Sequence, residues 1–115
     1  MQSQTTKLIA SWLKAFNSEC TRKNYQADLV QFFNWIKEKD ILSVQEKDIR
    51  NFILDLEEKG LSKRTRNRRL ATIKSFYNWL WETSRLKNNP AERIRLERLS
   101  ENEKKVEPLR GKSDA

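Results

Sequence analysis

Apolar residues recur every three or four positions along most of the chain, which is the spacing that places side chains on one face of an α-helix. The first run predicts a helix near residues 5–18, with an apolar stripe of Leu8, Ile9, Trp12, Leu13 and Phe16. A second helix is expected to have Thr21 as its N-cap and to bury Tyr25, Leu29, Phe32, Phe33 and Ile36. Lys39 and Asp40 end this second stripe.

Two further stripes follow. The third predicts a helix over residues 45–59 with Ile49, Phe52, Ile53 and Leu56 inward, and Gly60 stands where a left-handed C-terminal cap is needed. Ser62 is expected to cap a fourth and longest helix, which reaches about residue 83 and buries Leu70, Ile73, Phe76, Tyr77, Leu80 and Trp81. No strand pattern or internal repeat interrupts the series.

The helical pattern breaks at Asn89-Pro90, because proline removes a backbone donor and restricts the residue before it. A short helical piece is expected from Ala91, using Ile94, Leu96 and Leu99. Residues 100–115 are nearly all polar or charged and cannot bury themselves. The prediction is therefore an all-α protein: a compact four-helix bundle of two helical hairpins over residues 1–99, then a flexible polar linker or tail over residues 100–115.

Charge adds a class of partner to this fold. The net charge is +8 and the isoelectric point is about 9.8, which favours a polyanionic partner or an anionic membrane surface. No signal peptide or membrane span is visible, and the single cysteine, Cys20, cannot form an internal disulfide. We therefore expect a cytoplasmic protein without a membrane partner, and the family resemblance given below implies a bacterial or phage origin.

The positive charge is concentrated on the fourth predicted helix. From Ser62 to Leu80 there are six basic residues and no acidic one, whereas residues 40–59 hold six acidic and three basic residues. Bases in the first turn, Lys63, Arg64 and Arg66, oppose the helix dipole, and a phosphate bound there would remove the conflict. The polar face of this helix comprises Arg64, Asn67, Arg68, Ala71, Lys74, Ser75 and Asn78.

A smaller polar patch occupies the start of the second predicted helix, at Thr21, Arg22, Lys23 and Asn24. Both patches have an ordinary alternative, because capping residues and solvated bases give the same pattern as an anion site. The aromatic side chains of Phe76 and Tyr77 fall on the buried side and are expected in the core. Trp35 and Trp79 are expected to pack at helix edges.

Catalytic chemistry is not indicated by the residue types. The chain has no histidine, one cysteine and two isolated glycines. This composition excludes a His-based acid–base pair, a zinc cluster of cysteines and a glycine-rich phosphate loop within these residues. We therefore predict no catalytic residue, no metal site and no cofactor in this chain.

Four patterns, read in order, resemble the core-binding domain of tyrosine recombinases, the phage-integrase and Xer-type enzymes. They are T-x-x-x-Y-x-x-D-L-x-x-F-x-x-W from Thr21, V-x-x-x-D-I-R-N-F-I from Val44, G-L-S-x-R-T-x-N-R-x-L-A-T-I-K-S-F-Y-N-W-L from Gly60, and N-P-A from Asn89. The resemblance covers about residues 5–95. The match depends on the order and spacing of the four patterns taken together.

The resemblance implies a SAM-like four-helix bundle that binds one side of double-stranded DNA. The other half of this clamp would be a separate C-terminal domain with the Arg, Lys, His and Tyr catalytic set. The starts of the second and fourth helices would approach the DNA, here Thr21 to Tyr25 and Ser62 to Lys74. The candidate DNA-binding residues are accordingly Thr21, Arg22, Lys23, Asn24, Ser62, Lys63, Arg64, Thr65, Asn67, Arg68 and Lys74.

Val106 to Leu109 looks like the usual entry into that catalytic domain, whose residues would all lie beyond Ala115. The leading hypothesis is a DNA-binding module of a tyrosine recombinase, non-catalytic by itself and monomeric in isolation. Its partners would be DNA, the catalytic domain and other recombinase protomers. Two alternatives stay open: a stand-alone DNA-binding regulator or recombination accessory factor, and a helical protein-interaction module that uses Trp35, Trp79 and the polar tail.

Overall fold

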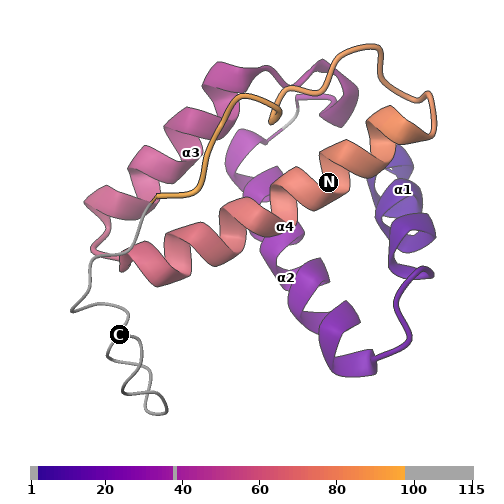
Figure 1. Cartoon of the computed structure of the whole chain (residues 1–115), viewed down its shortest axis with the longest axis horizontal. Coiled ribbons are helices and arrows are strands. Elements are labelled where there is room, and N and C mark those ends of the chain that lie inside the picture. The colour runs from indigo at the N-terminus through magenta and orange to yellow at the C-terminus, as the bar shows by residue number, and fades with distance from the viewer. Residues whose placement is uncertain (1–2, 38, 98–115) are drawn as a thin grey trace.

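Four α-helices make up most of the computed structural model, which describes residues 3–37 and 39–97 (Figure 1). They are α1 (Ser3–Leu13), α2 (Glu19–Ile36), α3 (Glu46–Glu58) and α4 (Lys63–Glu82), with a short 3-10 helix at Ile41–Ser43 between α2 and α3. Within the described ranges no residue lies in a strand. The prediction of an all-α, four-helix protein is confirmed.

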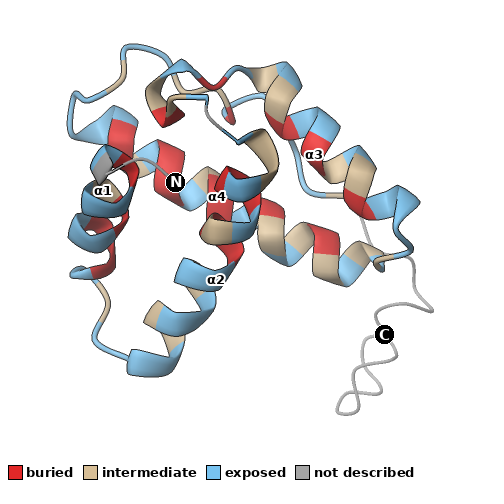
Figure 2. Cartoon of the chain, turned by 180° about the vertical axis from the view of Figure 1, so that it is seen from behind, coloured by how far each residue is buried: buried red, intermediate tan, exposed pale blue. Residues whose placement is uncertain are grey.

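The helices form two hairpins, α1 with α2 and α3 with α4, which cross where α4 passes over α2 (Figure 1). The α3–α4 turn is made by Gly60, whose φ of +90° is the left-handed cap expected from the sequence. The Leu61 amide donates to the Leu56 carbonyl at 3.1 Å and completes this cap. From their crossing, the N-terminal halves of α2 and α4 diverge and reach toward the same side of the bundle (Figures 1 and 2).

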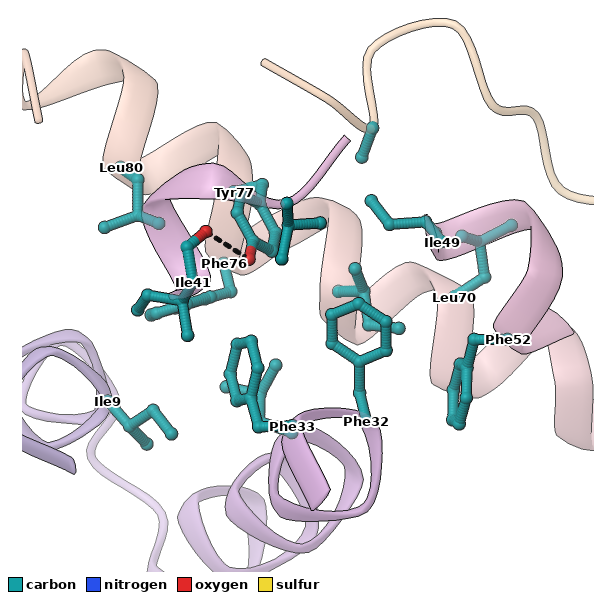
Figure 3. Packing of buried hydrophobic residues seen from close by; sticks show 14 of the residues in the cluster. Ile9, Phe32, Phe33, Ile41, Ile49, Phe52, Leu70, Phe76, Tyr77 and Leu80 are labelled. Carbon is teal, nitrogen blue, oxygen red and sulfur yellow. Dashed lines mark hydrogen bonds between the residues drawn. The ribbon is translucent and has the colours of Figure 1, made fainter. Parts of the chain in front are cut away.

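One apolar core fills the space between the hairpins, where the buried positions of all four helices meet (Figure 2). Its centre is built from Leu29, Phe32, Phe33, Ile49, Phe52, Leu70, Ile73, Phe76, Tyr77 and Leu80. The Tyr77 hydroxyl donates to the Ile41 carbonyl at 2.8 Å, so its polar atom is satisfied inside the core (Figure 3). Trp35 and Trp79 pack at the edge, half-buried, as expected.

After α4 the chain turns back and runs along α4 toward its N-terminal end (Figure 1). We call residues 86–97 the return segment. Its Ala91 and Ile94 side chains are buried, but residues 90–93 form a turn rather than the short helix expected, and Leu96 is 47% exposed rather than inward. The Lys74 ammonium donates to the Ala91 and Ile94 carbonyls, which ties this turn to α4.

Three further expectations are wrong. Ser18, not Thr21, caps α2, since the Ser18 Oγ accepts a hydrogen bond from the Thr21 amide at 3.2 Å. The first helix ends at Leu13 rather than near residue 18, because residues 14–18 form a turn and the loop that leads to this cap. Trp81 is 50% exposed, because no element fully covers its side of the last turn of α4. Leu99, Val106 to Leu109 and the predicted linker over residues 100–115 lie outside the described residues.

No helix in the described part of the chain is both long enough and apolar enough to span a membrane.

Candidate nucleic-acid interface

The N-terminal half of α4 forms one wall of an open groove with a volume of about 500 Å³. The groove is lined by Arg64, Thr65, Asn67, Arg68, Ala71 and Leu96. The first four of these were singled out from the sequence as DNA-binding candidates, and Ala71 was placed on the same helix face. The fold thus gathers them at one surface, to which the return segment adds Leu96.

The first turn of α4 begins at this groove. Ser62 caps the helix as predicted, with its Oγ accepting the Thr65 amide at 3.2 Å. The turn contains no acidic residue, Lys63 is half-buried, and Arg64 is exposed. Backbone N–H groups at a helix N-terminus, together with neighbouring bases, form a surface suited to a phosphate.

Behind the groove lies a buried acid that the charge pattern did not reveal. Asp28 of α2 is 2% exposed, and the Thr72 hydroxyl donates to its Oδ2 at 2.9 Å. Arg68 brings Nη2 to 3.2 Å from Oδ1 and Nη1 to 3.4 Å from Oδ2 of the same carboxylate. Because the Arg68 side chain is 53% exposed, it reaches from the buried carboxylate to the groove surface. The available signal was the position of Asp28 between Tyr25 and Phe32 of the apolar stripe.

Two polar residues of α4 hold the end of the return segment. The Arg66 guanidinium is buried and donates to both carboxylate oxygens of Glu97 at 3.0–3.2 Å, and its Nη1 donates to the Leu61 carbonyl at 2.6 Å. Asn67 exchanges two hydrogen bonds with the Glu97 backbone, at 2.7 and 2.8 Å. For Arg66, the conflict with the helix dipole is therefore relieved by Glu97 and needs no ligand.

Lys74 is also engaged within the protein. Its ammonium donates to the Ala91 carbonyl at 2.7 Å and to the Ile94 carbonyl. Burial lowers the pKa of this ammonium, and the nearby positive charge of Arg95 lowers it further, while Glu92 opposes the shift. Lys74 thus secures the return segment, and a contact with DNA stays a prediction.

The candidate residues at the start of α2 also fall into two groups, those that bond within the protein and those that are exposed. Thr21 belongs to the helix cap, and Arg22 is half-buried, with its guanidinium donating to the Phe16 carbonyl in the loop after α1. Lys23 and Asn24 are exposed. Lys23 lies 3.9 Å from Glu19, and both side chains are 75% exposed, so this long ion pair contributes little. Lys23 and Asn24 are the residues here that face solvent.

The chain is similar in sequence to a known protein family and to several known proteins. A family model described as the phage integrase N-terminal SAM-like domain matches residues 4–83. The chain is 36% identical over 84 residues to tyrosine recombinase XerC of Chlorobaculum parvum, covering 65% of this chain and 25% of that protein. It is 39% identical over 67 residues to the SPbeta prophage-derived probable integrase/recombinase YopP of Bacillus subtilis, covering 52% and 19%.

A third similar protein, tyrosine recombinase XerC of Treponema denticola, is 31% identical over 86 residues, covering 73% of this chain and 28% of that protein. No solved structure gives a significant match. The chain therefore spans between 19% and 28% of the length of these three relatives.

Proposed function

The chain belongs to the phage integrase N-terminal SAM-like domain family, and from this premise we propose that it is a double-stranded DNA-binding module of a tyrosine recombinase. This module binds one side of the crossover site and supplies no catalytic residue. The observation that carries the proposal is the groove at the start of α4, where an acid-free helix N-terminus adjoins the exposed side chains of Arg64 and Arg68.

Binding would come mainly from neutralisation of backbone phosphates by these bases. Arginine suits this role because its planar guanidinium binds a phosphate through two parallel hydrogen bonds. The small side chain of Ala71 lets the DNA backbone approach the helix. Lys23 and Asn24 provide a second contact, because the N-terminal halves of α2 and α4 reach toward the same side of the bundle (Figure 1).

In this proposal, other candidate residues stabilise the structure around the groove. Ser62 and Thr65 order the first turn of α4, and Asn67 holds Glu97 beside the groove. Asn67 uses both its amide nitrogen and its carbonyl oxygen in this contact, which favours a structural part over the reading of a base edge. Direct contacts from these residues to DNA stay predictions.

The family relationship also suggests the wider assembly. We propose that residues 1–99 form the DNA-binding unit and that residues 100–115 connect it to a C-terminal catalytic domain, which closes the clamp and meets other recombinase protomers. The bacterial and prophage relatives favour action in the bacterial cytoplasm. The isolated module would be monomeric and bind with modest affinity, because half of the clamp is missing.

The test compares two double variants that remove the same charge. Arg64→Ala with Lys23→Ala takes one exposed base from each patch. Lys47→Ala with Lys87→Ala takes two exposed lysines outside the groove, one at the start of α3 and one in the return segment. Fluorescence anisotropy with a labelled duplex should show affinity falling about tenfold for the first pair, as expected for a loss of about 1.4 kcal/mol, and much less for the second. Equal losses for the two pairs would refute the proposed surface.

A further inference from the structure

We propose that Asp28 is a positioning residue for DNA binding: together with Thr72 it holds the Arg68 guanidinium at the groove, so that a DNA phosphate meets a pre-oriented charge. The inference rests on the DNA-binding function proposed above. Asp28 is a buried acid in a protein whose proposed partner, DNA, is an anion. Its negative charge alone would weaken DNA binding, whereas holding Arg68 in place gives it a role that favours binding.

The packing around Asp28 explains how it can hold a surface arginine. Asp28 and Thr72 are both 2% exposed, and the hydrogen bond of 2.9 Å between their side chains joins α2 to α4. Thr72 follows Arg68 by one helical turn, so both side chains approach Asp28 from the same face of α4. A buried carboxylate is stable only when it is paired and hydrogen-bonded, and these two residues meet that need.

The contact leaves Arg68 available to a ligand. The Asp28 carboxylate engages Nη1 and Nη2, while a guanidinium carries five N–H donors in a planar fork. The side chain is 53% exposed and lines the groove, so its remaining donors can meet a phosphate. An arginine already held in place loses less side-chain freedom on binding, and the complex is correspondingly tighter.

One substitution, Asp28→Asn, distinguishes an effect of the Asp28 charge from a positioning effect, because the two would change the affinity for DNA in opposite directions. Asp28→Asn keeps the shape of the side chain and an oxygen acceptor for Thr72, but removes the negative charge. If Asp28 acts only through its field, the loss of a negative charge should tighten DNA binding. If Asp28 positions Arg68, the same change should weaken binding, by about 3- to 10-fold in the dissociation constant, because the arginine is no longer held.

The experiment measures duplex affinity by fluorescence anisotropy for the unaltered chain, Asp28→Asn, Arg68→Ala and the double variant, with urea unfolding to confirm that each is folded. The proposal expects weaker binding for Asp28→Asn, and no loss, or a gain, when Asp28→Asn is added to Arg68→Ala. Unchanged or tighter binding for the single variant overturns the proposal. So does an equal loss in both backgrounds, because that result would indicate a general structural effect.

A second pair of variants covers the case in which Asp28→Asn does not fold. Thr72→Ser retains the hydroxyl that orients Asp28, and Thr72→Val removes it while conserving volume. The serine variant should bind DNA like the unaltered chain and the valine variant more weakly; equal affinities overturn the proposal.

A measurement without DNA separates this inference from the function on which it rests. The NMR order parameter of the Arg68 Nε–H should fall in Thr72→Val relative to Thr72→Ser, and an unchanged value overturns the positioning role. If the folded, unaltered chain binds no duplex, the DNA-binding function fails and the positioning role fails with it. If the unaltered chain binds but these variants do not behave as stated, only the positioning role fails.

Discussion

Asn67 and Glu97 are bound to each other by two hydrogen bonds: the Asn67 amide donates to the Glu97 carbonyl at 2.7 Å and accepts from the Glu97 N–H at 2.8 Å. These two hydrogen bonds resemble the pairing between two β-strands, except that the Asn67 side-chain amide takes the place of one strand's backbone. They bring the return segment back to the first turns of α4, where Leu96 becomes part of the groove wall. The shape of the candidate DNA surface therefore depends on residues that follow the bundle in sequence.

The Arg66–Glu97 ion pair should stabilise the bundle measurably. Glu97→Gln retains the shape of the side chain but leaves the buried Arg66 guanidinium without its counter-charge, and we expect the free energy of unfolding to fall by about 1–2 kcal/mol. The estimate is below that for a fully buried pair because the Glu97 side chain is 38% exposed. Urea unfolding gives the value, with Glu82→Gln, at the exposed end of α4, as the control. Similar losses in both variants would show that the pair is not important for stability.

The buried hydroxyl of Tyr77 should contribute to stability through its hydrogen bond to the Ile41 carbonyl. Tyr77→Phe conserves the ring and removes the donor, so the carbonyl loses its partner from Tyr77. We expect a loss of about 1–2 kcal/mol at neutral pH, measured by urea or thermal unfolding. An unchanged midpoint would mean that water or a small shift of the backbone replaces the bond.

The contribution of the Tyr77 hydroxyl to stability should also depend on pH. Burial, and then the negative charges of Asp40 and Asp48, raise the pKa of Tyr77 well above its ordinary value of 10.0. The unfolded chain therefore releases this proton first, so the contribution of Tyr77 is complete below about pH 10 and decreases as the pH rises above it. The stability difference between the unaltered chain and Tyr77→Phe should shrink above about pH 10. A constant difference would contradict the buried environment of the hydroxyl.

DNA binding should weaken steeply with salt, because each neutralised phosphate releases counterions. The logarithm of the association constant should fall against the logarithm of salt concentration with a slope of roughly −0.9 per phosphate contacted. The Arg64→Ala and Lys23→Ala double variant should have a shallower slope, by up to about 2 if each base meets one phosphate, while Lys47→Ala with Lys87→Ala should keep the original slope. A flat response in the unaltered chain would count against a phosphate-binding surface.

The helices and the core could be read from the sequence because neighbouring residues determine them. Gly60 and Ser62 end one helix and begin the next through contacts within a few positions, and the stripe from Leu70 to Leu80 follows from helical periodicity. Where two residues of the cap type stood close together, at Ser18 and Thr21, the same local rules led to the wrong one, Thr21. The concentration of bases on α4 was likewise visible in the sequence.

The partners of those bases depend on contacts between distant parts of the chain. Arg66 meets Glu97 from 31 positions away, Arg68 meets Asp28 from 40, and Thr72 meets Asp28 from 44. Periodicity tells which way a side chain points around its own helix, but it carries no information about what packs opposite. For that reason the charge pattern of α4 identified a basic face, and the packing of α2 and the return segment against it left Arg64 and Arg68 as the arginines that line the groove.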